Sequence, residues 1–325
     1  MARYLIVRIG SLIVSIVLAT MIVFAIMHAI PGGPFDAEKA PLTPVQQANI
    51  MRLYGLDKPL PLQYLSFLWG AVRFQFGYPY ESPGETMAEF LGRTWTISAA
   101  VGGAGLLLGV VGGLILGITA AVYRNTWIDY VATTISLLSI TLPSYIISLG
   151  LVFVFALLLH WFPPSGWDGP RTWVLPILAY AAIPVGPVAR YTRASMLDMA
   201  ARPYVVVARA KGLGRWRVLN RHVLRNVWRP LITVTLPFIP GIMTGSIFVE
   251  SIFNVPGLGL FFVSSITRRD YPLEMTLIYL VALMIGVTYL VTDLLYVALD
   301  PRVRLQGVCA PPRHGTRRGA VRLML

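Results

Sequence analysis

Two carboxylic acids interrupt apolar stretches of this 325-residue chain, Glu250 and Asp293. An ionisable group at membrane depth is a functional candidate, because burying a charge in hydrocarbon is costly. Three interpretations stay open for these acids: a structural hydrogen-bonding role, a role in gating or substrate contact, and proton transfer. Two isolated acids make a poor proton relay, so the structural role is favoured and proton coupling is the weakest.

Other catalytic chemistry is not indicated. The four histidines, His28, His160, His222 and His314, are dispersed, and Cys309 is the single cysteine. Neither residue type occurs with metal-ligand spacing. The chain has no G-x-x-x-x-G-K-[ST] phosphate-binding loop. We therefore expect a protein that is not an enzyme, with no cofactor and no resident metal.

The most informative segment is cationic and runs from Pro203 to Pro230, PYVVVARAKGLGRWRVLNRHVLRNVWRP. A short helix is expected over Tyr204–Leu213, ended by glycines. After it, helical periodicity separates an apolar face from a ladder of arginines; the two sets are Trp216, Leu219, Val223 and Val227, and Arg217, Arg221, Arg225 and Arg229. This arrangement suits docking to a partner. An interfacial membrane anchor, apolar side towards the membrane, is the alternative, and nucleic-acid binding is the weakest interpretation.

The elements that position these residues are membrane-spanning helices. Hydrophobic residues make up 56% of the chain and charged residues 13%, with a net charge of +13; a soluble domain has about 25% charged residues. Apolar runs of about 20 residues indicate an all-α integral membrane protein. Six spans are expected, at Ile9–Ile30, Thr94–Val122, Tyr130–Leu159, Trp173–Tyr191, Leu231–Phe253 and Met275–Leu299. The first is expected to be retained rather than cleaved as a signal peptide.

Basic residues orient these spans. With the N-terminus inside, 19 of the 27 Lys and Arg residues fall in inner segments and 8 in outer ones. Cytoplasmic loops carry the excess of such residues. Both termini are therefore expected in the cytoplasm.

The chain divides into four expected segments. Residues 1–30 hold the N-terminus and first span, and residues 31–93 form an extracytoplasmic loop segment. The loop sequence LYGLDKPLPLQYLSFLWGAV predicts a short helix packed on the membrane surface. Residues 94–305 form the core, with a coupling loop at 193–229. Residues 306–325 are a Gly/Pro/Arg-rich cytoplasmic tail with a composition typical of disorder.

The second span carries glycines four residues apart, Gly105, Gly109, Gly113 and Gly117. This repeat places them on one helix face, where another helix can approach closely. Packing within the chain is the favoured interpretation, and an interface with a second membrane subunit is the alternative.

Six motifs in order resemble the permease subunits of binding-protein-dependent ABC importers, in the dipeptide/oligopeptide/nickel branch. They are AIPGGPFD, LYGLDKPLPLQYL, ARAKGLG…RHVLRNVWRPLI, VESIFNVPGLG, RRDYPL and DLLYVALDPRVRL. The resemblance covers about Arg3 to Leu305. It implies a type I ABC importer permease-like bundle of six transmembrane helices with a cytoplasmic coupling helix.

The family's coupling motif is a Glu-Ala-Ala triplet followed by a glycine. Here the triplet aligns with Val206, Val207 and Ala208, and the glycine with Gly212. The glutamate is absent, which puts in doubt any contact that needs its carboxylate. The resemblance implies that coupling to an ATPase uses Tyr204, Val206, Val207, Ala208, Arg209, Ala210, Lys211, Gly212 and Leu213.

The resemblance also implies partners and a location. The partners are a second homologous permease in a heterodimer, two cytoplasmic ATP-binding subunits, an extracytoplasmic solute-binding protein and the lipid bilayer. The location is a bacterial or archaeal cell (inner) membrane. The implied solutes are dipeptides, oligopeptides or a related small solute such as a nickel chelate. A proton-coupled secondary transporter is the alternative function, and it would be expected to show paired intramembrane acids or internal repeats.

Overall fold

The computed structural model describes residues 2–30, 51–80 except 53, 84–219, 224, 227, and 231–299 except 233. In this part of the chain the regular elements are all helices, which confirms the all-α prediction. They are α1 (Ala2–Ala29), α3 (Leu60–Val72), α4 (Met87–Val122), α5 (Trp127–Thr141), α6 (Ser144–Leu151), the π-helix η1 (Val152–Leu158), α7 (Pro170–Ala200), α8 (Pro203–Ala210), α9 (Arg215–Val218), α11 (Phe238–Met243), α12 (Ile247–Phe253), α13 (Leu258–Arg268) and α14 (Tyr271–Leu299).

Four helices, α1, α4, α7 and α14, are long and apolar enough to cross a membrane. Two bent pairs pass the same test together, α5 with α6–η1 and α11–α12 with α13. Counting each pair as one span gives up to six spans. The six expected apolar stretches are therefore present, but two of them are not simple helices.

The third expected span, Tyr130–Leu159, is broken rather than continuous. Its two halves meet at an angle of 116°. Leu142 has an extended backbone, with φ −82° and ψ 127°, and Pro143 follows it. A residue before proline is pushed out of the helical region and proline donates no backbone hydrogen bond, so the helix stops here.

The fifth expected span, Leu231–Phe253, is also interrupted. Helix α11 ends at Met243 and α12 starts at Ile247. Between them Gly245 has φ +79°, a conformation open to glycine but strained for other residues. After α12 the chain bends by 69° into α13. The prediction of one continuous helix over this span was therefore wrong.

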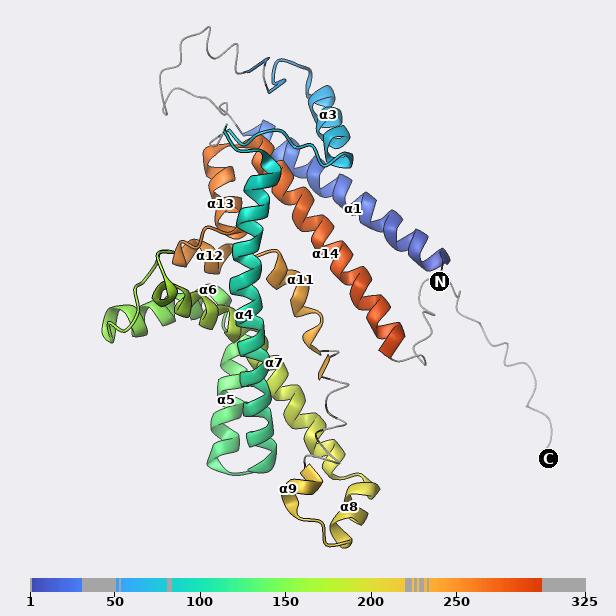
Figure 1. The fold of residues 1–325 in the computed structure, drawn as a ribbon, viewed down its shortest axis with the longest axis vertical. Coiled ribbons are helices and arrows are strands. Elements are labelled where there is room, and N and C mark those ends of the chain that lie inside the picture. The colour runs from blue at the N-terminus through green and yellow to red at the C-terminus, as the bar shows by residue number, and fades with distance from the viewer. Residues whose placement is uncertain are drawn as a thin grey trace, which may run out of the picture.

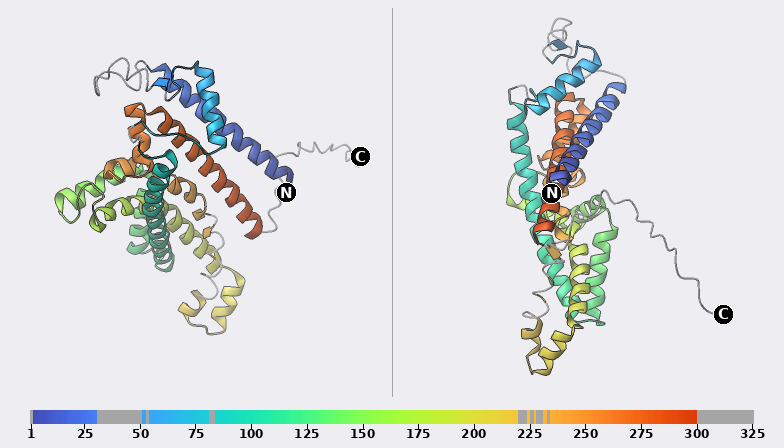
Figure 2. Two further views of the ribbon diagram at one scale, coloured as in Figure 1. Left: turned by 45° about the horizontal axis from the view of Figure 1, so that its top comes forward. Right: turned by 90° about the vertical axis from the view of Figure 1, so that its right-hand side faces the viewer.

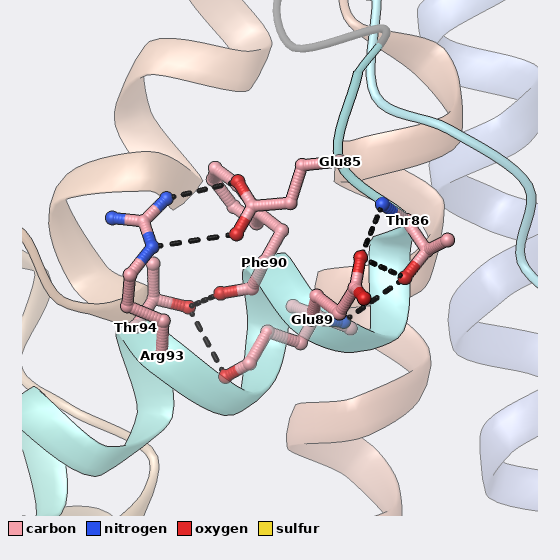
Figure 3. A network of polar contacts seen from close by, with 7 residues as sticks. Glu85, Thr86, Glu89, Phe90, Arg93 and Thr94 are labelled. Atoms are coloured by element: carbon pink, nitrogen blue, oxygen red, sulfur yellow. Dashed lines mark hydrogen bonds and ion pairs between the residues drawn. The ribbon is translucent and has the colours of Figure 1, made fainter.

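Helix α4 begins before the expected Thr94, at Met87. Its start is fixed by a capping box: Thr86 accepts a hydrogen bond from the backbone N–H of Glu89, and the Glu89 carboxylate accepts one from the backbone N–H of Thr86 (Figure 3). Such a box satisfies two amide groups that a helix end otherwise leaves unpaired. Arg93 adds an ion pair to Glu85 at 3.1 Å.

Some helices run side by side, as α1 does with α14, whereas α7 crosses α4 at an angle (Figures 1 and 2). Helix α4 packs most extensively on α7, and α1 runs antiparallel to α14. At one end of that pair Tyr4 and Arg8 contact the carboxylate of Asp293 at 2.6 and 3.0 Å. At the other end Tyr271 Oη donates to Met27 O at 3.4 Å. The first turns of α1 and the last turns of α14 therefore lie at the same end of the bundle.

Candidate functional site

Helix α8 lies at the end of the bundle where α7 stops, beyond the ends of α4 and α5 (Figure 1). Its inner face is buried: Val205 and Ala208 are 0% and 5% exposed. They form an apolar cluster with Met196 on α7 and Val218 after the turn. The last turns of α4 pack against the same cluster through Ile118. Helix α8 therefore packs against the ends of two long apolar helices, α7 and α4.

The opposite side of α8, which we name the outer face of α8, is apolar and exposed. Tyr204, Val206 and Val207 are 43%, 57% and 53% exposed. Ala210 and Lys211 are exposed beside them. An exposed apolar patch on an element outside the spans is typical of a protein–protein contact. This face is therefore suited to entering a groove of a partner.

A glycine ends α8. Gly212 has φ +76°, and a side chain built on it would meet nothing within 4 Å. Backbone conformation rather than space therefore favours glycine at this position. After this turn Leu213 is half-buried against the cluster under α8.

The basic helix predicted after the turn is described only in part. Helix α9 covers Arg215–Val218, and Arg217 is exposed. Leu219 and Val227, from the predicted apolar face, pack against the cluster under α8. These contacts count against the alternative of a membrane anchor for these two residues, because the protein buries Val227 and partly covers Leu219. The other members of the ladder, Arg221, Arg225 and Arg229, lie outside the described residues.

An ion pair that sequence reasoning missed braces this end of the bundle. Arg193 on α7 pairs with Asp129 on α5, and Asp129 is 3% exposed. Asp129 also accepts hydrogen bonds from the backbone N–H of Asn125 at 3.0 Å and from Thr133 Oγ1 at 3.3 Å. The signal in the sequence is an aspartate in the first turn of an apolar helix. Its partner, 64 residues away, carries no local signal.

The glycine ladder of α4 faces α7. All four glycines are buried. Each would bring an added side chain against α7: Gly105 faces Tyr180, Gly109 faces Ala181, Gly113 faces Val188 and Gly117 faces Thr192. The ladder is thus filled by a helix of the same chain. This contact favours the intramolecular interpretation over an interface with a second subunit.

Glu250 is completely buried and fully surrounded by donors. Tyr180 on α7 donates to Glu250 Oε1 at 2.8 Å, and the backbone N–H of Gly259 donates to Oε2 at 2.6 Å. Ser98 on α4 also hydrogen-bonds this carboxylate, and its Oγ accepts from the N–H of Leu258 at 2.8 Å. The carboxylate therefore ties α4, α7, α12 and the start of α13 together.

Asp293 is paired as well, with Arg8 and Tyr4 of α1. Each of the two acids singled out in the sequence is thus held by polar partners, on both oxygens of Glu250 and on Oδ2 of Asp293. These contacts favour the structural interpretation for both, because a proton carrier must exchange its partners during transport.

Two further acids, near the junction of α13 and α14, were not anticipated. Asp270 accepts from the backbone N–H groups of Tyr80 at 2.8 Å and Leu273 at 3.1 Å. Ser265 donates to the buried Glu274. Burial raises the pKa of the Tyr80 hydroxyl, and the Asp270 charge raises it further. Among the residues that the structure describes, no three His, Cys, Asp or Glu side chains gather as metal ligands.

Comparison with known proteins identifies a family. Residues 113–305 match the "Binding-protein-dependent transport system inner membrane component" family. Residues 1–104 match the family described as "Binding-prot-dependent transport system membrane comp, N-term". Together the two matches cover nearly the whole chain.

Similarity to individual proteins agrees with these family matches. The chain is 38% identical over 306 residues to the dipeptide transport system permease protein DppB of Bacillus subtilis, covering 94% of this chain and 99% of that protein. It is 32% identical over 306 residues to the oligopeptide transport system permease protein OppB of Escherichia coli K12, covering 94% and 100%.

A solved structure shares the fold. It is an inward-facing structure of the MetNI methionine ABC transporter, with a TM-score of 0.54 and 16% identity over 66% of this chain and 98% of that one. This similarity supports the type I ABC importer permease fold. With the two family matches and the relatives, it shows that the chain belongs to the binding-protein-dependent transport system inner membrane components.

Proposed function

We propose that this chain is the permease subunit of an ATP-driven ABC importer that carries dipeptides or oligopeptides across the cell membrane. The family and the named functions of its relatives support this function. The observation that carries the mechanism is the outer face of α8, an apolar surface outside the spans that is braced from behind by α4 and α7. No observation favours a nickel chelate over a peptide.

The partners follow from what the chain lacks and what it exposes. Its sequence contains no phosphate-binding loop, so ATP hydrolysis belongs to other polypeptides. Two ATP-binding subunits would receive α8 and the equivalent helix of a second homologous permease in a heterodimer. An extracytoplasmic binding protein would deliver the peptide. The proposed coupling residues are those of α8 and its turn, Tyr204, Val206–Leu213.

The proposed mechanism is alternating access driven through α8. When ATP closes the ATP-binding subunits, α8 moves with them. Because Val205 and Ala208 are packed against α4 and α7, that motion displaces the ends of both helices. The Arg193–Asp129 ion pair transmits the displacement of α7 to α5. The same helices then alternate between two packed arrangements. Interfaces between domains or subunits repack in the same way when these rotate as rigid bodies.

Proton-coupled transport has less support. Glu250 and Asp293 both have fixed hydrogen-bonding partners. The relatives named above are dipeptide and oligopeptide transport system permease proteins, and the matched family is one of binding-protein-dependent transport systems. A proton gradient alone is therefore not expected to drive uptake.

The proposed topology places α8 and both ends of the chain in the cytoplasm. Asp293 holds the first turns of α1 to the last turns of α14, so these segments share a side. The excess of basic residues marks that side as cytoplasmic. On this topology residues 31–93 join the first two spans on the extracytoplasmic side. Residues 94–305 form the core, and residues 306–325 form a cytoplasmic tail.

Reconstitution tests the function. Vesicles that contain this chain, a homologous permease and the ATP-binding subunits should take up peptide when ATP and a loaded binding protein are supplied. Vesicles that contain this chain alone should not, with ATP or with a proton gradient. Peptide accumulation by the chain alone under a proton gradient would contradict the proposal.

Labelling tests the topology separately. In a Cys309→Ser background, a single cysteine at Arg171 should react with an impermeant thiol reagent added outside intact cells. A cysteine at Arg124, in the turn between α4 and α5, should react only after the cells are opened. The reverse pattern would overturn the proposed orientation.

A further inference from the structure

One side of α3 is exposed in the part of the chain that the structure describes. Leu62, Leu65, Trp69 and Val72 are 51%, 58%, 60% and 73% exposed. Their spacing of three, four and three residues places them on one helix face, which we name the α3 stripe. None of the 13 residues of α3 is charged.

The pair formed by α1 and α14 provides a depth scale. Its register is set by three antiparallel contacts: Tyr271 with Met27, Gly286 with Leu12, and Asp293 with Arg8. A hydrocarbon core of about 30 Å corresponds to about 20 helical residues. Counted along α1 from the charged pair at Arg8, the far edge of that core falls near His28.

Helix α3 is anchored well inside that edge. Tyr64 Oη lies 3.1 Å from Thr20 Oγ1 on α1, and its ring is 5.4 Å from the Phe24 ring. Thr20 is eight residues before His28, which is about 12 Å of helix. Through Tyr64, the side of α3 opposite the stripe contacts the outer third of α1, and Figure 1 shows α3 near the outer end of α1.

The other end of α3 gives the same depth. Tyr279 Oη on α14 donates to Ala71 O at 3.4 Å, and the Phe74 and Tyr279 rings are 6.5 Å apart. Tyr279 is eight residues into α14 from Tyr271, again about 12 Å. Two independent contacts, one to each long helix, therefore place α3 at one level.

We propose that α3 lies within the bilayer, in the leaflet on the side where α1 ends, and that the α3 stripe binds phospholipid acyl chains. This differs from the surface location that the loop sequence suggested. At this depth the surroundings are hydrocarbon, and a charge-free helix can enter them because its own backbone groups are hydrogen-bonded.

The residues of the stripe fit lipid better than a second protein helix. Helix contacts in membranes are enriched in small residues that let backbones approach. The stripe consists of two leucines, a tryptophan and a valine. The glycine of α3, Gly70, faces its own chain at Gln75 O rather than the stripe.

Arg73, directly after α3, fits a phospholipid as well. Its guanidinium lies 4.2 Å above the Trp69 ring. A long basic side chain near hydrocarbon extends towards the headgroups, where a phosphate pairs with it. A lipid thus offers both partners that this face needs, acyl chains for the stripe and a phosphate for Arg73.

Spin-label accessibility in vesicles tests the proposal. Nitroxides are attached to single cysteines at Leu65, Trp69 and Val72 in a Cys309→Ser background. Ile13, exposed on α1, is the lipid reference, and Ser165, exposed in the loop before α7, is the aqueous reference. The complex with its partner subunits is used, so that protein contacts are present.

The proposal predicts that the stripe behaves like Ile13, with high collision rates for oxygen. Collisions with a water-soluble nickel chelate should be lower than at Ser165 by a factor on the order of ten or more, because hydrocarbon excludes polar solutes. Nickel accessibility equal to that at Ser165 would place the stripe in water. Low accessibility to both reagents would show that protein covers it. Either result overturns the proposal without affecting the transport function.

Discussion

Arg193 on α7 donates two hydrogen bonds to Asp129 on α5, from Nε to Oδ1 at 2.7 Å and from Nη2 to Oδ2 at 2.8 Å. The carboxylate is buried, whereas the Arg193 side chain is 31% exposed. This parallel geometry is the strongest form of a carboxylate–arginine pair. It fixes the end of α7 from which α8 continues, so the pair joins α8 to the bundle.

Arg193→Ala should destabilise the protein by about 3 kcal/mol, because it leaves the Asp129 carboxylate buried without its partner. Arg193→Lys should recover part of this loss, since lysine keeps the charge but not the two parallel bonds. Thermal unfolding in detergent measures both. Arg171→Ala, in the first turn of α7, is the control and should unfold like the wild type. Equal stability of Arg193→Ala and wild type would show that the pair does not brace the bundle.

Gly109→Ala should lower stability by about 2 kcal/mol, because an added side chain meets the Ala181 carbonyl on α7 and overpacks the interface. Gly103→Ala, on the same helix, is the matched control, since a side chain there meets nothing within 4 Å. Alanine is also the better helix former, so the control should be neutral or slightly stabilised. If the two variants melted together, the close packing of α4 on α7 would be wrong.

Glu250→Leu should destabilise by about 2 kcal/mol or more, because it leaves the Tyr180 hydroxyl and the Gly259 amide buried without an acceptor. Glu85→Leu removes an acid from a more accessible ion pair and should cost less. The melting temperatures of the two variants decide the matter. A smaller loss for Glu250→Leu than for Glu85→Leu would argue against a structural role for Glu250.

Gly212→Val should impair ATP-coupled uptake without disturbing the spans, because valine is strained at φ +76°. Gly214→Val is the control two residues away, where a side chain also meets nothing within 4 Å and the backbone is not in the left-handed region. Peptide uptake by reconstituted vesicles is the measurement. Wild-type uptake by Gly212→Val would mean that the turn after α8 has no part in coupling.

The sequence predicted which stretches form apolar helices better than where those helices break. Pro176, Pro184 and Pro187 all lie inside α7, whereas Pro143 separates α5 from α6. A proline removes the same hydrogen bond in each case, and the neighbouring helices decide whether the remaining groups find partners. Local sequence does not contain that information.

At the candidate site, too, local sequence predicts the helix but not the contacts that it makes with other helices. Periodicity and the resemblance together placed a short helix at Tyr204–Leu213, and the structure has α8 there. Which face of it is exposed depends on the cluster formed with Met196 and Ile118, from two other helices. The Asp129–Arg193 pair and the donors around Glu250 likewise join residues far apart in the chain, so no spacing rule predicts them.

The most direct test of the central claim is ATP hydrolysis by the reconstituted transporter, with and without peptide-loaded binding protein, for Val207→Asp. Val207 is half-exposed on the outer face of α8, so the substitution should leave folding intact while placing a charge in the apolar contact. Thr126→Asp, exposed in the turn between α4 and α5, adds the same charge on the same side as a control. We predict that loaded binding protein stimulates hydrolysis in wild type and Thr126→Asp but not in Val207→Asp. Full stimulation in Val207→Asp would contradict the assignment of α8 as the coupling element.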